Sequence, residues 1–332
     1  MSLPRSPFAA SSAIPGTGDI VLSSLPPGKQ VLTSLTYQYP LKLIAPDPHH
    51  ASDEKHVTVV FLLTYGGGLV GGDKISLKVE LQDSTRLVLL TQGSTKIFRS
   101  PERSVVSGQT LDVKIGSHAA LCYLPDPTQP FAESVYEQKQ TFYVDPRGSS
   151  SLVLLDWVTE GRRARGESWT LWSWKGRNEV REFDRTSKGR LLLRDAVLLQ
   201  DDDLAGTVLA DKSHDMGIFG TLIVYGPLFD ALGHFFVQEF ASQPRIGAQN
   251  WTTLVDERSG PTSNEADVRA QNSQRWERTD KLLWTVARVR GFVLVKFGAQ
   301  EIDGAKKWLA NLLKREGTVE KYFGHQALIC LR

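Results

Sequence analysis

Four carboxylates lie in or beside glycine-rich or strand-like segments of the sequence, where their neighbours would fix them in place. They are Asp73, Asp156, Glu160 and Glu167. Carboxylates hold late divalent metals more weakly than imidazole or thiolate ligands do, which suits a metal ion that moves through a protein. The ordinary alternative for the last three is an ion pair with a nearby arginine, Arg162 or Arg165, because arginine pairs carboxylates through parallel hydrogen bonds.

Recognisable catalytic motifs are absent from the sequence. It contains no GxSxG nucleophile elbow, no HExxH and no Cys–His pair at a metal-ligand spacing. Cys122 and Cys330 lie far apart and form neither a disulfide framework nor a CxxC pattern, which indicates a reducing, cytoplasmic compartment. The residues alone therefore show no catalytic constellation.

A run of glycines imitates a nucleotide-binding loop. It comprises Gly66, Gly67, Gly68, Gly71 and Gly72, and it follows an apolar segment. The dinucleotide fold needs a helix after such glycines, yet residues 75–82 alternate as a strand does. Asp73 also stands where a phosphate-binding loop needs its lysine. We therefore expect these glycines, together with Gly161 and Gly166, to serve sharp turns and close backbone approaches.

Length and charge exclude several classes of protein. The chain has 332 residues and a net charge of 39 − 37 = +2, so it lacks the broad positive field of a nucleic-acid binder. The longest apolar stretch, residues 57–72, is shorter than the roughly 20 residues that cross a membrane. We expect residues 1–18 to form a flexible tail and residues 19–332 a single β-rich domain.

Alternation of apolar and polar residues dominates the chain and predicts a mainly β fold. Residues 75–82, 111–115 and 169–174 alternate, which we interpret as antiparallel strands with one wet face. Shorter apolar runs predict more deeply buried strands, at residues 57–63, 152–155, 191–193, 222–225 and 292–295.

About two helices are expected near the C-terminus. Apolar residues recur with helical spacing over 305–313, with Asp303 placed to cap the start and Gly317 the end. A second helix over 265–283 is the alternative to an irregular loop, because residues 245–280 are polar and poor in aliphatic side chains.

Three tryptophans, Trp169, Trp172 and Trp174, favour one competing function. Aromatic platforms bind sugars, so a β-rich carbohydrate-active enzyme or glycan-binding module is the alternative function. A glycosidase needs two carboxylates across the scissile bond, and no persuasive pair is evident. Core tryptophans on a strand are the more economical interpretation.

Six segments in a fixed order resemble the urease accessory proteins UreD, also called UreH. They are PLKL at 40–43, YGGGLVGGDK at 65–74, TQGSTKIFR at 91–99, LCYLPDP at 121–127, GRRARGE at 161–167 and GTLIVYGP at 220–227. Cys122 departs from the acidic residue common in the family, so no metal role is carried over to it. Residues 47–56 and 245–280 look like insertions, either contact loops or solvated loops.

The resemblance implies a fold of stacked β-sheets in a β-helix-like arrangement. It also implies an assembly factor that is not an enzyme and holds no permanent cofactor. Such a factor binds apo-urease and a UreF-type adaptor, which recruits a UreG-type GTPase that delivers nickel. Nickel would then pass along carboxylates, and the four named above become candidates for lining its path. Polar residues of the second large motif are candidate partner contacts: Thr91, Gln92, Thr95, Lys96 and Arg99.

Overall fold

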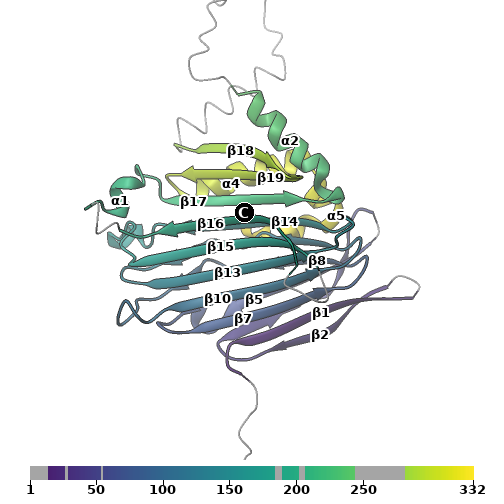
Figure 1. Cartoon of the computed structure of the whole chain (residues 1–332), viewed down its shortest axis with the longest axis horizontal. Coiled ribbons are helices and arrows are strands. Elements are labelled where there is room, and N and C mark those ends of the chain that lie inside the picture. The colour runs from purple at the N-terminus through teal and green to yellow at the C-terminus, as the bar shows by residue number, and fades with distance from the viewer. Residues whose placement is uncertain (1–13, 27–28, 54, 184–188, 202–205, 244–280) are drawn as a thin grey trace, which may run out of the picture.

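Two stacked β-sheets and a layer of helices make up the structure, a computed structural model (Figure 1). It describes residues 14–26, 29–53, 55–183, 189–201, 206–243 and 281–332. The predicted mainly β, stacked-sheet fold is confirmed, and we call the two sheets sheet A and sheet B.

Sheet A holds seven strands. In spatial order they are β16 (Leu191–Leu199), β15 (Ser173–Glu182), β13 (Val135–Val144), β10 (Ser107–Ile115), β7 (Lys74–Leu81), β1 (Thr17–Leu25) and β2 (Lys29–Tyr37). Sheet B has a longer main path: β18 (Leu283–Val289), β19 (Phe292–Ala299), β17 (Ile218–Tyr225), β14 (Ser151–Thr159), β11 (Ala120–Tyr123), β8 (Arg86–Leu90), β5 (His56–Thr64) and β3 (Leu41–Ile44). Short strands join it at β4 (His49–His50), β6 (Gly68–Leu69), β9 (Thr95–Ile97) and β12 (Thr128–Pro130).

The chain winds between the two sheets as a β-helix does. It passes from β7 in sheet A to β8 in sheet B, then alternates through β10, β11, β13, β14 and β15. Each full turn returns the chain in the same direction, so β7, β10, β13 and β15 pair in parallel, as do β5, β8, β11 and β14. The antiparallel pairing predicted for residues 75–82 and 111–115 is therefore wrong.

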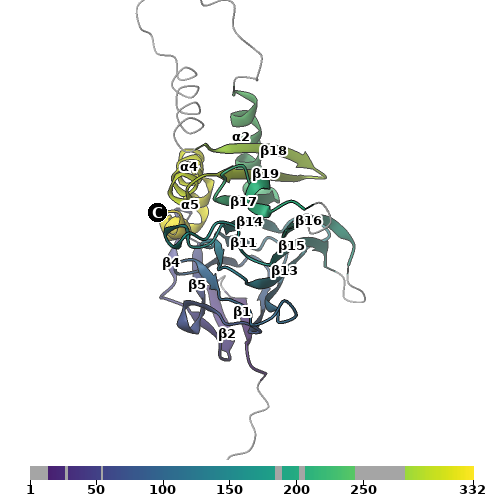
Figure 2. The same ribbon diagram turned by 90° about the vertical axis from the view of Figure 1, so that its left-hand side faces the viewer.

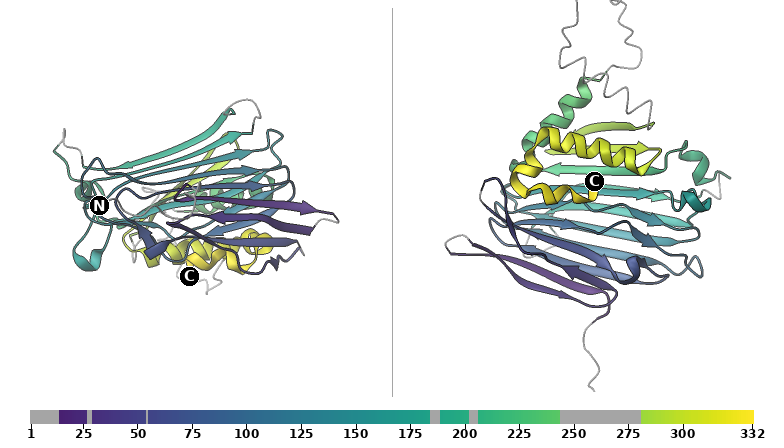
Figure 3. Two further views of the ribbon diagram at one scale, coloured as in Figure 1. Left: turned by 90° about the horizontal axis from the view of Figure 1, so that it is seen from below. Right: turned by 180° about the vertical axis from the view of Figure 1, so that it is seen from behind.

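That error has a physical cause in how sheet A is covered. Helices α2 (Asp230–Ala241), α4 (Ile302–Glu316) and α5 (Thr318–Phe323) lie against sheet B, and none of the described helices covers the outer face of sheet A (Figures 2 and 3). Strand β7 accordingly alternates between exposed or half-buried and buried residues. Alternation reports one-sided exposure, and in most folds this accompanies antiparallel pairing because helices cover both faces of parallel sheets. In this fold the exposure is one-sided although the strands are parallel.

The hydrophobic core divides into two clusters. One fills the space between the sheets and includes Leu22, Leu121 and Phe142. The other lies between sheet B and the helices and includes Trp157 and Leu313. The even-numbered residues of β14 face the first cluster and the odd-numbered residues face the second.

The predicted C-terminal helix is present as α4 (Ile302–Glu316), and Gly317 ends it with a left-handed conformation. Asp303 lies inside the first turn and does not cap it, because the helix begins two residues earlier than expected. Helix α5 (Thr318–Phe323) follows directly. Among the described residues, three helices were not predicted: α5, α1 (Leu209–Lys212) and α2 (Asp230–Ala241). Single 3-10 turns span Tyr65–Gly67, Arg163–Arg165, Pro227–Phe229 and His325–Leu331.

The expected second helix falls mostly outside the described residues, and residue 283 begins strand β18. Residues 1–13 of the expected tail also lie outside them, and β1 begins at Thr17, before the expected end of that tail. A single domain over 19–332 stays a prediction. Among the described residues, no helix is both long and apolar enough to cross a membrane.

The glycine run makes the expected crossover, since strand β7 and no helix follows it. At Gly68 a Cβ would come within 2.3 Å of the Lys96 carbonyl oxygen, so the close pairing of β6 with β9 needs glycine there. Gly66 has a φ of 75°, a left-handed conformation that favours glycine at the preceding turn. Gly66 and Gly68 thus have the turn and close-approach geometry that the structural interpretation expects.

Two of the three tryptophans lie in the core, but not on one strand. Trp169 precedes β15 and has a positive φ, so the strand predicted for 169–174 is wrong at its start. The Trp169 indole N–H donates to the Met216 carbonyl at 2.7 Å, and the Trp174 indole N–H donates to the Thr128 hydroxyl at 3.1 Å. Both rings are almost fully buried, which leaves neither free to serve as a sugar platform.

Candidate functional site

A polar layer interrupts the apolar core between the sheets, centred on Asp156 of β14. The Asp156 carboxylate accepts two hydrogen bonds from sheet A, from the Gln138 side-chain amide at 2.8 Å and from the Asn178 side-chain amide at 2.6 Å. Burial raises the pKa of the Asp156 carboxyl above its ordinary value, and the two amide hydrogen bonds only partly offset this. The surroundings of Asp156 thus destabilise its ionised form.

The layer continues along sheet B at the same register. Asp156 lies opposite Thr221 of β17, which lies opposite Lys296 of β19. The Lys296 ammonium is 2.6 Å from an Asp195 carboxylate oxygen on β16 and 3.3 Å from the Thr221 hydroxyl. Because the Lys296 side chain is 45% exposed, the layer runs from this solvent-accessible end inward to Asp156.

Sheet A supplies the facing half of the layer. Gln140, Asn178 and Asp195 lie side by side on β13, β15 and β16. Within the described part of the chain, the Gln140 and Asn178 side-chain oxygens are buried and accept no hydrogen bond. An unpaired buried acceptor costs about 1–3 kcal/mol. These two oxygens are therefore free to receive a water or a cation.

A small cavity of about 20 Å³ borders the buried end of the layer, with Gln109, Gln138, Gln140 and Asp156 among its lining residues. That volume is enough for about one water molecule. Protein surrounds Asp156 densely, yet its side chain keeps some accessible area because it faces this space.

Two buried tyrosines complete the inner end. The Tyr136 hydroxyl donates to the Gln138 side-chain oxygen at 3.3 Å. Burial raises the pKa of both Tyr123 and Tyr136, so both phenols stay neutral. The charged groups that act on Asp156 are then Asp195 and Lys296, and with Asp156 ionised the layer has two carboxylates for one ammonium.

The other three candidate carboxylates do not join this layer. Asp73 accepts the Val70 backbone N–H at 3.0 Å within its own turn. Glu160 lies just beyond the end of β14, 2.5 Å from the Arg163 Nε and 2.5 Å from the Ser168 hydroxyl. No group of three His, Cys, Asp or Glu side chains able to hold a metal ion occurs among the described residues.

Glu167 makes the arginine pair that was the alternative interpretation. The Arg162 guanidinium donates to both of its carboxylate oxygens, one of them at 2.9 Å, and holds the pKa of Glu167 below its usual value. Arg162 also lies 3.8 Å from the centre of the Phe131 ring. Glu160 pairs with Arg163, a different arginine from the two named in that alternative.

The candidate partner-contact residues divide by exposure. Gln92, Lys96 and Arg99 are exposed and Thr95 is half-buried. Thr91 is 5% exposed, and its hydroxyl lies between the Asp126 carboxylate and the Asp126 backbone N–H. Thr91 therefore lies in the interior. It directly follows strand β8, which the C-terminal residues cover.

Sequence reasoning missed Gln138, Gln140, Asn178 and Lys296, although a signal for them exists. Gln138, Gln140 and Asn178 occupy positions that the alternation of their strands directs inward, where apolar residues are normal, whereas Lys296 is exposed. A polar residue in the buried phase of a strand marks an interior polar network. Finding these residues required knowing which face of each strand was buried.

Comparison with known proteins identifies the family. The profile of the UreD urease accessory protein family matches residues 16–329. The chain belongs to the UreD family. UreD proteins form an accessory family and not an enzyme family.

Relatives occur in bacteria and fungi. The chain is 35% identical over 298 residues to the urease accessory protein UreD of Sorangium cellulosum, covering 88% of this chain and 84% of that protein. It is 28% identical over 283 residues to a ureD-like urease accessory protein of Schizosaccharomyces pombe, covering 85% and 88%. It is also 28% identical over 326 residues to urease accessory protein 4 of Cryptococcus neoformans, covering 91% and 90%. Family and relatives together support a role in urease maturation.

Proposed function

We propose that this chain is a non-catalytic assembly factor that binds apo-urease and a UreF-type adaptor and assists nickel insertion. The adaptor would in turn hold a UreG-type GTPase. Family membership supports the urease-maturation part of this proposal. The exposed residues Gln92, Lys96 and Arg99 are our candidates for contact with one of these partners.

Nickel passes, on this proposal, along the polar layer between the sheets as cargo and not as a resident cofactor. The observation that carries this step is Asp156, a buried carboxylate beside two unpaired amide oxygens. Oxygen ligands bind nickel weakly enough for release. The surplus of one carboxylate over ammonium groups favours a cation in the layer.

Glu160 is the second candidate for this path. It lies four residues beyond Asp156, which is about 13 Å along an extended chain. The contacts of Asp73 and Glu167 support local roles, in a turn and in an arginine pair respectively. We propose a cytoplasmic location for the chain, in keeping with its two free, buried cysteines.

Co-expression tests the assembly role. The tagged chain is produced with apo-urease, the adaptor and the GTPase of the same organism, and urease activity is measured with and without the chain. We expect the components to copurify and activity to be lost when the chain is omitted. A folded chain that neither copurifies nor changes activity would refute the proposal.

Charge reversal tests the candidate contact surface in the same assay. We expect Lys96→Glu to weaken copurification with one partner, because Lys96 is exposed and makes no ion pair among the described residues. The matched control is Lys307→Glu, an exposed lysine on α4. Equal copurification of the two variants would remove Lys96 from the interface.

A further inference from the structure

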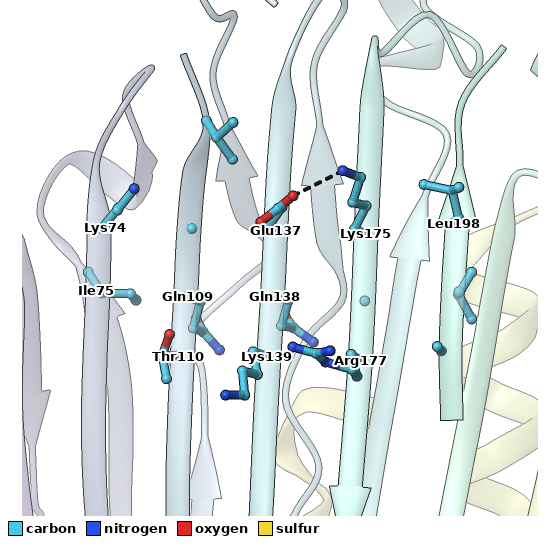
Figure 4. A pocket seen from close by; sticks show the side chains of 15 residues that line it. Lys74, Ile75, Gln109, Thr110, Glu137, Gln138, Lys139, Lys175, Arg177 and Leu198 are labelled. Carbon is cyan, nitrogen blue, oxygen red and sulfur yellow. Dashed lines mark hydrogen bonds and ion pairs between the residues drawn. The ribbon is translucent and has the colours of Figure 1, made fainter. Parts of the chain in front are cut away.

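The outer face of sheet A has a groove of about 750 Å³ that crosses its strands from β7 to β16 (Figure 4). Lys74 lies at one end on β7, and Leu198 on β16 lies at the other. Side chains of β13 and β15 line the middle. None of the described helices covers this face (Figure 3).

Positive charge dominates the groove. Its charged lining residues are four cations and one carboxylate: Lys74, Lys139, Lys175, Arg177 and Glu137. Glu137 pairs with Lys175 at 3.0 Å and neutralises it. Within the described part of the chain, neither Lys74 nor Lys139 has an ion pair, although the whole chain has a net charge of only +2.

Arg177 is only weakly neutralised. Its Nε lies 3.8 Å from a Glu179 carboxylate oxygen, whereas Arg181 and Arg194 approach the same carboxylate to 2.8 and 3.0 Å. Lys139 lies directly opposite Arg177 on the neighbouring strand. Like charges opposite one another on a sheet face are destabilising. A carboxylate placed between Lys139 and Arg177 would relieve that repulsion.

We propose that this groove binds an acidic, extended segment of a partner protein. Five neighbouring strands span about 19 Å, which is the length of about six extended residues. Lys74 lies two strands away from Lys139 and is offset from it by two residues along the strand direction. The two positions are therefore about 12 Å apart. Two carboxylates four residues apart in an extended segment match that spacing, with Leu198, 55% exposed, available for an apolar contact at the far end.

The lining favours a peptide over a nucleic acid. No aromatic side chain lines the groove, so bases would find no stacking platform. Glu137 stands among the cations and would repel a continuous phosphate backbone, whereas a peptide can place a neutral residue beside it. The proposal goes beyond the proposed role in nickel insertion and does not depend on it.

Peptide binding to the purified full-length chain tests the proposal. The probe is a fluorescein-labelled octapeptide with Glu at positions 2 and 6 and neutral residues elsewhere, followed by fluorescence anisotropy. Its counterpart has Gln at both positions. We expect Lys139→Gln/Arg177→Gln to weaken binding of the acidic peptide by at least about tenfold. The control Lys78→Gln/Lys114→Gln removes the same charge from the same face outside the groove and should change affinity less than about twofold.

Three results would overturn the inference. Equal binding of the Glu and Gln peptides would exclude carboxylate recognition. Equal losses in the two double variants would reduce the effect to general charge. Tighter binding of a thymidine oligonucleotide than of the peptide, lost in the Lys139/Arg177 variant, would assign the groove to nucleic acid instead.

Discussion

Asp156 differs from the other candidate carboxylates in what surrounds it. Glu160 and Glu167 face arginines, and Asp73 accepts a backbone N–H. Asp156 instead accepts hydrogen bonds from two neutral amides across the gap between the sheets. Neutral donors and the more distant Lys296 compensate its negative charge only in part, and this makes Asp156 the residue best suited to receive a cation.

The raised pKa of Asp156 predicts a pH dependence of stability. The folded state binds this proton more tightly than the unfolded state, whose carboxyl titrates near ~3.9. The free energy of unfolding of the wild type, minus that of Asp156→Asn, should therefore be highest below about pH 4 and fall as pH rises through the folded pKa. Urea denaturation from about pH 3.5, near the unfolded pKa, up to about pH 7.5 measures it.

Asp53 provides a matched carboxylate whose pKa is shifted in the opposite direction. Its hydrogen bonds with the buried Arg86 guanidinium, at 2.7 and 2.8 Å, hold the pKa of Asp53 below its usual value. The free energy of unfolding of the wild type, minus that of Asp53→Asn, should therefore be highest above about pH 4 and should fall as pH falls through the folded pKa. The same slope in both variants would contradict the assignment of these two environments.

At the scale of elements, the sequence predicted which segments are strands better than how they pair. Runs such as residues 57–63 and 152–155 lie in β5 and β14. Parallel pairing was not predictable from them, because local alternation reports exposure and carries no information on strand direction. Winding between two sheets is a long-range property, and each return of the chain spans tens of residues.

The candidate site was predictable only in part for the same reason. Asp156 was identified as a candidate because it lies beside a family-like motif, whereas its partners Gln138 and Asn178 come from distant strands of the other sheet. Only the stacking of the sheets brings them together. Helix α2 was missed although Asp230, His234 and Gln238 recur at helical spacing along its exposed side.

Helix α4 is tied to sheet B by a buried ion pair, which gives an element-scale prediction. The Lys306 ammonium lies 2.7 Å from the Asp126 carboxylate, whose side chain is 7% exposed. Lys306→Met leaves that charge unpaired and should lower the free energy of unfolding by about 3 kcal/mol. The adjacent, exposed Lys307→Met should change it by less than about 0.5 kcal/mol, as chemical denaturation would show. Equal losses in the two variants would indicate that the ion pair contributes nothing to the free energy of unfolding.

The pairing of β6 with β9 depends on Gly68. An added Cβ would meet backbone, so Gly68→Ala should lower the free energy of unfolding by about 3 kcal/mol. At Gly93 a Cβ has open space and meets only a positive φ of 80°, so Gly93→Ala should cost about 1 kcal/mol. Thermal unfolding of both variants compares them, and a smaller loss for Gly68→Ala would contradict the close approach.

At the scale of the whole molecule, sheet B serves as support and sheet A as a contact surface. The central strands of sheet B are buried on both faces, because α4 and α5 cover its far side (Figure 3), whereas its edge strand β18 stays largely exposed. Sheet A keeps an open, charged outer face. The polar layer between them reaches solvent at Lys296 and ends inside at Asp156. Two stacked sheets of this kind can offer a surface for a partner on one face and a polar passage between them.

The most direct measurement is the nickel content of urease matured with wild-type chain or with Asp156→Asn. The control is Asp112→Asn, which removes a charge from the outer face of sheet A. With all components copurifying, we expect Asp156→Asn to lower nickel per urease active site by about tenfold and Asp112→Asn to leave it unchanged. Full nickel loading with a folded Asp156→Asn chain would contradict passage through the polar layer.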